Sequence, residues 1–551
     1  MQRNNTQQKK THILGKRKIQ RGMKSKQRKS SSTGTSTICK NLNFSDCELA
    51  ILRMAVDSAE TKMGMRVANS PDVQKIINIL EDFLKVKNLI CYGGTAINNI
   101  LPESDQFYDK NVEIPDYDFF SFNALNDAKE LADIYFKKGF VDVEAKAGQH
   151  HGTFKVYVNY IPIADITLVP KEIFNALKKD AIRVAGILYA PPNFLRMAMY
   201  LELSRPAGDI SRWEKVLKRL TALNKNYPLT TINCKTVEIQ RKMVDDDLSE
   251  KIYHNVKKTL IDQGVVLFGG AALSYYSKHM PAKSQKYETA SPDFDVIAHE
   301  PETVSEIVKE RLKDIGVMNT KIIHHDAAGE IIPEHCEIKV GKDTIAFIYK
   351  PIGCHSYNII VEQGQHIKVA TIDTMLSFYL AFLYAERPYY NEFSERILCM
   401  SKFLFDVQQK NRLSQDGVLK RFSINCYGHQ DSIEEIRAKK AEKYKELKLQ
   451  PNQKELDEWF LNYRPDKQQA HPQTFVHAEK KRSTTTATRA TRERATRATT
   501  ATTSTTSTRA RATTVTAEEA HPRRRKRKTK KTFFGFFGNK RRKKTYKRRK
   551  Y

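Results

Sequence analysis

The chain has 551 residues, enough for two or three domains with buried cores, and its formal net charge of +31 favours a polyanionic partner. Most of that charge lies in two tails, because residues 1–40 contain 12 Lys and Arg without any acidic residue and residues 480–551 contain 26 against three acids. No apolar run reaches the length of a membrane span, the basic N-terminus lacks the apolar segment of a secretory signal, and the eight cysteines include no C-x-x-C pair. We therefore expect an intracellular protein without a zinc ribbon or a disulfide framework.

The first part of the chain alternates helical and strand patterns. Residues 1–42 form a basic arm expected to be disordered. A helix is expected from about Ser45, which is a plausible N-cap, and a second from Pro71 to Lys87, after Ser70. The elements predicted next are the strand LICY, a short helix to Ile100, the strand DYDFFSF, a helix ending at Gly139, three strands within 140–170, and helices at 192–203 and 209–223. Residues 43–225 are thus predicted to be a mixed α/β domain.

The second part repeats this order. A helix at 248–263, the strand VVLF, two glycines, the strand SPDFDVIAHE, a helix and several further strands lead to a helix at 372–384. We predict a second α/β domain over 226–425, a C-terminal helical extension over 426–478 with a charged surface helix at 432–448, and a disordered basic low-complexity tail over 479–551.

The two halves share four features at nearly one spacing. The glycine pair Gly93-Gly94 recurs as Gly269-Gly270, and the carboxylate pair Asp116/Asp118 recurs as Asp293/Asp295. An apolar strand precedes each glycine pair, and an Arg-Pro step ends each unit. Four matches in the same order predict an internal duplication, hence two tandem modules, each a mixed sheet with flanking helices.

A strand that ends on Gly93-Gly94 and leads into a helix is typical of a phosphate site. Glycine lets a phosphate approach the backbone, and the helix N-terminus offers N–H donors and a positive dipole end. Asp116 and Asp118 alternate on a strand and share one face, so they either hold Mg²⁺ or lie on a solvated edge. The glycine motif upstream favours the metal.

Asp165 is the candidate third carboxylate, because it lies between apolar residues in the strand IPIADITLVP, where an unpaired Asp is costly to bury. The alternative interpretation is an outward-facing strand residue. In the second module, aligning the strands on their closing prolines places Phe347 opposite Asp165. The second module also has Ala271 after its glycine pair, where the first module has Thr95. We therefore expect the second module to keep the fold and to lack turnover.

These motifs resemble the DNA polymerase β-like nucleotidyltransferase superfamily. The segments more closely resemble poly(A) polymerase catalytic subunits of large DNA viruses, of the mimivirus and megavirus type and more distantly the poxvirus type: CYGGTAINNILP, DYDFFS, PNFLRMAMYLELSRP, GDISRWEKVLKRL and TIDTMLSFYLAFLYAERP. The resemblance covers about residues 45–425. It implies a template-independent adenylyltransferase that adds poly(A) from ATP to mRNA 3′ ends, and a homodimer.

The resemblance also implies roles for individual residues. Asp116, Asp118 and Asp165 would hold two Mg²⁺ or Mn²⁺ ions and be catalytic, and Gly93, Gly94 and Thr95 would bind the phosphates of ATP. Arg196, Arg212, Trp213 and Lys215 lie in helices where such enzymes hold base and triphosphate, and we predict Arg196 and Lys215 as ATP ligands. The alternative interpretation is that the three cations lie on a solvated basic helix face and that Trp213 is a core residue.

The sequence also leaves alternative functions open. The motif does not select the base, so a CCA-adding, uridylyl or oligoadenylate enzyme is the nearest alternative, and a non-catalytic RNA-binding scaffold is the alternative of another class. The basic tails either bind nucleic acid or, through RRRKRK at 523–528, serve as a nuclear-import or packaging signal. We expect the protein in the host cytoplasm at the viral factory, with the virion or nucleus as further locations.

Overall fold

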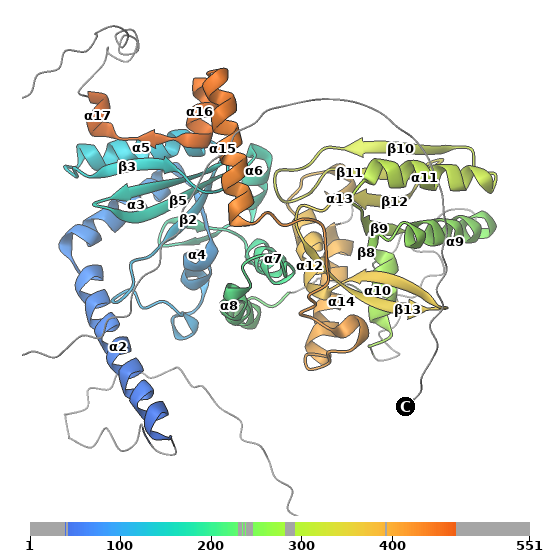
Figure 1. The fold of residues 1–551 in the computed structure, drawn as a ribbon, viewed down its shortest axis with the longest axis horizontal. Helices are drawn as coiled ribbons and strands as arrows, with labels where there is room; N and C mark the ends of the chain where they lie inside the picture. Colours follow the sequence, from blue (N-terminus) through green and yellow to red (C-terminus); the bar gives the residue numbers. More distant parts are fainter. Residues whose placement is uncertain are drawn as a thin grey trace, which may run out of the picture. The chain divides into compact units, whose positions relative to one another are not determined.

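The computed structural model describes residues 42–229, 246–280, 293–391 and 394–469, together with residues 39, 234 and 237. The predicted disordered arm at 1–42 lies almost wholly outside these residues, and the predicted tail at 479–551 lies entirely outside them. The described residues form two eight-stranded sheets flanked by helices (Figure 1). None of the helices among them is long and apolar enough to cross a membrane.

The first sheet has the strand order β16-β3-β4-β5-β2-β1-β7-β6. Its strands are β1 (Ile90–Tyr92), β2 (Tyr117–Ser121), β3 (Val143–Ala147), β4 (Thr153–Val158), β5 (Ile161–Leu168), β6 (Ile182–Val184), β7 (Ile187–Tyr189) and β16 (Asn462–Tyr463). β2 runs parallel to β5 and β1 runs parallel to β7, whereas the other neighbours are antiparallel. Its edge strand β16 comes from the C-terminal extension.

The second sheet has the order β10-β11-β12-β9-β8-β14-β13-β15. Its strands are β8 (Val266–Leu267), β9 (Phe294–Ile297), β10 (Thr320–His325), β11 (His335–Val340), β12 (Asp343–Tyr349), β13 (His355–Glu362), β14 (Gln365–Ala370) and β15 (Cys426–Tyr427). The parallel pairs are β9 with β12 and β8 with β14. From β3 to β6 and from β10 to β13, the two sheets therefore have the same order and the same strand directions, as a duplication requires.

The helices of the first module are α2 (Phe44–Ala68), α3 (Pro71–Lys87), α4 (Gly93–Ile100), η1 (Glu103–Asp105), α5 (Ala124–Lys137), α6 (Lys171–Lys179), α7 (Pro192–Leu203), η2 (Ile210–Arg212) and α8 (Trp213–Asn226). Those of the rest are α9 (Asp246–Asp262), α10 (Gly270–Ser277), α11 (Pro301–Asp314), α12 (Ile372–Phe382), α13 (Pro388–Asn391), α14 (Ser394–Lys410), η4 (Gly417–Leu419), α15 (Ile433–Leu449), α16 (Gln453–Phe460) and α17 (Pro465–Gln469).

The predicted helix starts are confirmed at α3 and shifted at α2. The Ser70 side chain accepts from the Val73 amide and Pro71 occupies the first turn, as such a start requires. At α2 the N-cap is Asn43, not Ser45, because the Asn43 side chain accepts from the Asp46 amide. The short strands β6 and β7 were missed, since three residues each are too few to give a periodic pattern.

Helices α7 and α12 join the two modules. Every residue of α12 is buried, and its neighbours include α7 and α14. The Phe194 and Tyr384 rings meet edge to face at 5.4 Å, and the Ser356 amide donates to the Ser204 carbonyl at 2.8 Å. The second module is thereby packed against α7, the helix that follows β7 of the first sheet.

The expectation of a protein without disulfides is wrong. The structure contains the disulfides Cys39–Cys47, Cys234–Cys399 and Cys354–Cys426, with Cα–Cα distances of 4.9, 5.5 and 5.2 Å. The last two join residues 165 and 72 positions apart, so only the fold brings them together and spacing in the sequence gives no sign of it. Cys91 and Cys336 are free and buried.

Candidate active site

Three carboxylates meet on the neighbouring strands β2 and β5. Asp118 lies opposite Asp165 in the parallel register of these strands, and Asp116 directly precedes β2. Asp118 and Asp165 are half-buried, and Asp116 is more exposed. The structure thus brings together all three residues that were predicted as metal ligands.

Burial and the neighbouring negative charges raise the pKa of two of these carboxyls, Asp116 and Asp118. Burial, together with the negative charges of Asp116 and Asp165, raises the pKa of Asp118 to about 7, against the opposing effect of Lys155 and Arg212. Burial and Asp165 likewise raise the pKa of Asp116. Lys155 forms an ion pair with Asp165 from the adjacent strand β4. Three crowded carboxylates with one lysine between them are a donor set that suits Mg²⁺ or Mn²⁺.

Gly93 is glycine because Asp118 lies against it. Its φ is +74°, and a Cβ there would lie 2.4 Å from Asp118 Oδ2. Next to it, a Cβ on Gly94 would lie 2.7 Å from the Tyr108 hydroxyl and 2.8 Å from Arg219 Nη1. The Thr95 hydroxyl donates to the Asp116 carbonyl at 2.5 Å and so ties the helix start to the carboxylate loop. The predicted phosphate seat therefore lies between the carboxylates and a cation.

That cation belongs to a basic cluster on η2 and α8, formed by Arg212, Lys215 and Arg219. The charges of Lys215 and Arg212 act on Asp116 and Asp118, and Arg212 and Arg219 lower the pKa of Lys215 in addition to its desolvation. Arg219 donates to Tyr108 and lies over the Phe107 ring at 5.0 Å. Lys215 and Arg212 were predicted from the sequence and Arg219 was not, although the spacing 212, 215, 219 indicates one helix face.

Arg196 lies elsewhere. It is 1% exposed, and its guanidinium donates to Asn193, to Asn224 Oδ1 at 2.7 Å and to the Tyr227 carbonyl. It ties α7 to the end of α8, and no described contact leads from it to the carboxylates. Trp213 is also placed by packing, because its Nε1 donates to the Glu202 carbonyl at 3.0 Å.

The raised pKa of Asp118 predicts a pH-dependent stability. A carboxyl whose folded pKa is about 7, against ~3.9 unfolded, binds its proton more tightly in the native state, so the native state loses stability as pH rises between these values. Asp118→Asn is therefore expected to raise the melting temperature of the metal-free protein by a few degrees at pH 8, and by less near pH 5. Melting curves in EDTA at both pH values measure this. An equal shift of the melting temperature at the two pH values would contradict the raised pKa of Asp118.

The second module has the same strand register and lacks the third carboxylate. Phe347 lies opposite Asp295 in the parallel register of β12 and β9, the position that Asp165 holds opposite Asp118, and a Cβ on Gly269 would lie 2.0 Å from Asp295 Oδ2. On the next strand, β11, Glu337 lies opposite Phe347, just as Lys155 on β4 lies opposite Asp165. The expected Phe347 correspondence is thus confirmed by register.

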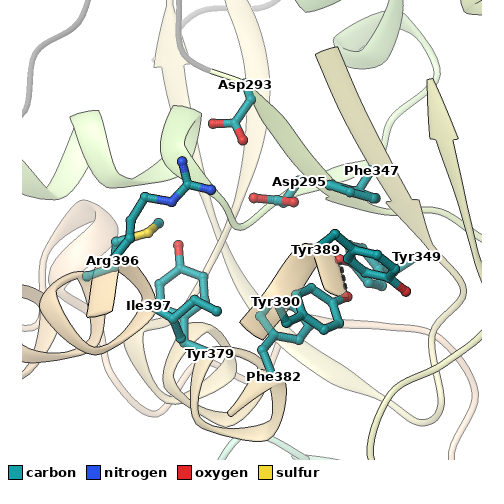
Figure 2. Close-up of a pocket in the computed structure, with 11 residues that line it drawn as sticks. Asp293, Asp295, Phe347, Tyr349, Tyr379, Phe382, Tyr389, Tyr390, Arg396 and Ile397 are labelled. Carbon is teal, nitrogen blue, oxygen red and sulfur yellow. Dashed lines mark hydrogen bonds between the residues drawn. The ribbon is translucent and has the colours of Figure 1, made fainter. Parts of the chain in front are cut away.

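The pocket beside Asp293 and Asp295 has a volume of about 40 Å³, room for a few water molecules and not for a nucleotide. Aromatic rings fill it: Phe347, Tyr349, Tyr379, Phe382, Tyr389 and Tyr390. Figure 2 shows the Arg396 guanidinium directed to the side of the pocket where the two carboxylates lie. This geometry does not support nucleotide binding beside Asp293 and Asp295.

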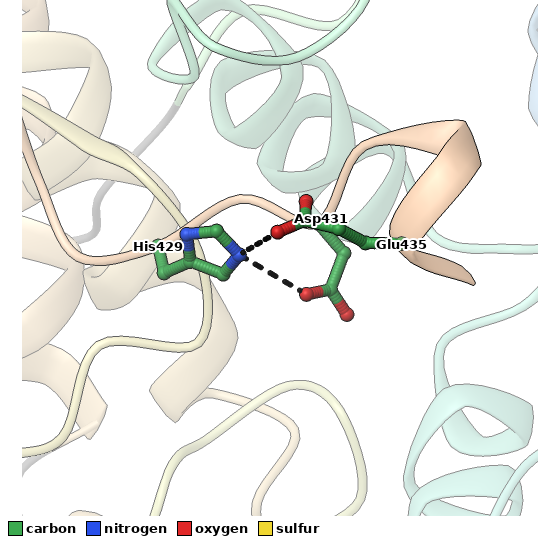
Figure 3. Close-up of side chains that lie close together, drawn as sticks. All are labelled: His429, Asp431 and Glu435. Carbon is green, nitrogen blue, oxygen red and sulfur yellow. Dashed lines mark ion pairs between the residues drawn. The ribbon is translucent and has the colours of Figure 1, made fainter. Parts of the chain in front are cut away.

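A further cluster, His429, Asp431 and Glu435, lies at the start of α15 (Figure 3). His429 Nε2 is 3.3 Å from Asp431 and 3.1 Å from Glu435. Glu435 also accepts from the Ser432 amide in a capping box, and Asp431 pairs with Lys439 at 2.5 Å. Helix capping and ion pairing account for these residues, so we assign no metal to them.

Comparison with known proteins points to one family. The family model described as "Poly(A) polymerase catalytic subunit" matches residues 78–209, which include the glycines, the three carboxylates and α7. The chain is 27% identical over 230 residues to a putative poly(A) polymerase catalytic subunit of Acanthamoeba polyphaga mimivirus, covering 40% of this chain and 38% of that protein. It is 31% identical over 178 residues to the protein of the same description from African swine fever virus (strain Badajoz 1971 Vero-adapted), covering 31% and 37%.

A solved structure extends the similarity to the whole fold. The crystal structure of the Megavirus polyadenylate synthase superposes with a TM-score of 0.65 at 21% identity, covering 82% of this chain and 90% of that one. The expected resemblance and the two-module α/β fold are therefore confirmed. The aligned part of this chain spans less than two fifths of the length of the curated relatives that it matches.

Proposed function

We propose that this chain is a poly(A) polymerase catalytic subunit, a template-independent adenylyltransferase that extends mRNA 3′ ends from ATP. One observation carries the proposal: Asp116, Asp118 and Asp165 meet beside Gly93 in the module that the family model matches, whereas Phe347 replaces the third carboxylate in the other. A scaffold that only binds RNA would have no use for three carboxylates that destabilise one another.

In this proposal, residues on one side of the site bind the phosphates of ATP, and residues on the other side bind the metal ions. The amides at the start of α4, with Gly93, Gly94 and Thr95, lie where they can bind the phosphates of ATP, and Lys215 and Arg219 add positive charge on that side. Asp116, Asp118 and Asp165 would hold two Mg²⁺ or Mn²⁺ ions, which supply charge neutralisation at the phosphates and activation of the RNA 3′-hydroxyl. Asp165, whose Oδ2 pairs with Lys155, is the proposed acceptor of the hydroxyl proton.

The reaction is then an in-line displacement. The RNA 3′-hydroxyl attacks the α-phosphate of ATP, a new P–O bond forms, and pyrophosphate leaves with the β- and γ-phosphates. Holding the two substrates in line contributes most where, as here, no residue forms a covalent intermediate.

We also propose that the chain forms a homodimer and works in the host cytoplasm. The dimer finds support in α2, whose only buried residue is Ala68 and whose apolar side chains include Phe44, Leu52 and Met63 at 85%, 57% and 69% exposure. Apolar side chains in such number on one exposed helix are typical of a protein interface. The proposed tail contacts with nucleic acid concern residues outside the described part.

The experiment that tests the activity is primer extension. The full chain is incubated with a labelled RNA oligonucleotide, Mg²⁺ or Mn²⁺, and each nucleoside triphosphate separately. Extension with ATP alone supports the proposal. Extension with CTP or UTP in preference would assign another terminal nucleotidyltransferase, and no extension with any nucleotide would favour the scaffold.

A further inference from the structure

A groove runs between α8 and α14, away from the carboxylates. It consists of two adjoining hollows of about 810 and 270 Å³. The residues that line both are Leu217, Thr221, Gln408, Gln409, Arg412 and Arg421. We call this the α8–α14 groove (the two helices are labelled in Figure 1). Its volume exceeds what the aromatic pocket of the second module offers by more than tenfold.

The groove has basic side chains and no acidic ones among its lining residues. No Asp or Glu is among its lining residues, whereas Lys225, Lys410, Arg412 and Arg421 are. Two of these cations are already paired: Lys225 with Asp105 at 2.7 Å and Arg421 with the buried Asp373 at 2.8 Å. Lys410 and Arg412 are exposed and have no carboxylate partner within the described part of the chain. They supply net positive charge at the rim, which favours a polyanion.

An amide in the wall lacks a partner. Gln408 is 7% exposed, and its Oε1 accepts from the Tyr200 hydroxyl at 3.4 Å, but its Nε2 makes no hydrogen bond to any described residue. A buried donor left unpaired costs about 1–3 kcal/mol, so such a group in the wall of a groove indicates a ligand acceptor. Asn224, Gln409 and Asn411 add further amides, and Phe405 and Phe422 add aromatic side chains. Cations, amides and aromatic rings together are the lining of a single-strand nucleic-acid groove.

Helix α8 connects this groove to the active site. At 3.6 residues per turn, Lys215 and Arg219 lie on one face of the helix, and Leu217, Thr221 and Asn224 lie on the opposite face. The first face supplies the basic cluster beside the carboxylates, and the second lines the groove. A strand that leaves the active site therefore has to cross one helix, about 10–12 Å wide, to reach the groove.

We propose that the α8–α14 groove binds the single-stranded RNA upstream of its 3′ end, with phosphates at Lys410 and Arg412 and a base edge at Gln408. This inference rests on the proposed function for the direction of the strand. It can fail on its own, because the test below measures binding without ATP and without turnover.

The test compares two charge reversals in the full chain. Lys410→Glu with Arg412→Glu alters the groove, and Lys313→Glu with Lys342→Glu makes the same charge change at exposed positions of the second module. Affinity for a labelled oligo(A) of about 15 nucleotides, within the range of single-strand site sizes, is measured by fluorescence anisotropy over a salt series.

We expect the groove variant to bind at least about tenfold more weakly than the control variant, with a salt slope smaller by about one to two. Equal affinities and slopes in the two variants would overturn the inference, as would absence of binding by the wild-type chain. Primer extension by the wild type then reports separately on the proposed function.

Gln408→Met tests the amide. It keeps the side chain's length, and we expect weaker oligo(A) binding at an unchanged or raised melting temperature, because the unpaired Nε2 is removed. A lower melting temperature with unchanged affinity would assign Gln408 to packing alone and remove it from the groove's contacts.

Discussion

Replacing Asp165 with asparagine is expected to lower the rate of ATP incorporation on the order of a thousandfold, equivalent to about 4 kcal/mol of transition-state stabilisation. Asp165 lies opposite Asp118 across β5 and β2, and its carboxylate is both the third metal donor and the proposed proton acceptor. Asparagine keeps the shape and hydrogen-bonding oxygen but removes the charge. The measurement is the single-turnover rate of adding one adenylate to a bound primer.

The fold of this variant is expected to persist. Asp165 is half-buried and its ion-pair partner Lys155 is also partly exposed, so loss of this pair leaves a lysine that water can reach. The melting temperature should therefore stay within a few degrees of the wild-type value. Full activity of the Asp165→Asn variant would contradict the assignment of Asp165 as the third metal carboxylate.

Gly93→Ala is expected to reduce activity by about a hundredfold and to destabilise the protein. The φ of +74° costs a non-glycine residue about 1–2 kcal/mol, and the new Cβ would lie 2.4 Å from Asp118 Oδ2. Asp118 must move away from its position beside Asp165, and a displacement of this size at a reacting centre costs rate as well as stability. Steady-state extension rates and melting curves measure the two effects.

Gly269→Ala is the matched control in the second module. Its Cβ would lie even closer to the corresponding carboxylate, 2.0 Å from Asp295 Oδ2, so it should lower the melting temperature too. The expected extension rate of the folded variant is that of the wild type, because Asp295 has Phe347 beside it in place of a third carboxylate. A loss of rate as large as that of Gly93→Ala would show that the second seat takes part in the chemistry.

Several features of the fold follow from the sequence for physical reasons. The glycine pairs predict a close approach to the backbone, which the sequence assigns to a phosphate. In the structure the groups that lie against Gly93 and Gly269 are the carboxylates of Asp118 and Asp295. The alternation of polar and apolar residues in DYDFFSF and IPIADITLVP predicts two strands, because residues of one parity share a face. The structure pairs these strands with Asp118 opposite Asp165. The loss at Phe347 was also readable, since the closing prolines set the register.

Other parts of the site depend on contacts that no local pattern records. Arg196 and Arg219 are both helical arginines in the sequence, yet one is buried against Asn193 and Asn224 while the other faces Gly94. The disulfide Cys234–Cys399 and the groove residue Gln408 likewise depend on chain segments far apart in sequence. Burial and partner choice at such positions follow from the tertiary fold.

The central claim is that one module performs the chemistry and its duplicate does not. The most direct test is ATP extension of an RNA primer by Asp118→Asn and by Asp295→Asn, which change residues at equivalent register positions of the two sheets. We expect a loss on the order of a thousandfold in Asp118→Asn and the wild-type rate in Asp295→Asn. Equal losses, or a loss only in Asp295→Asn, would contradict it.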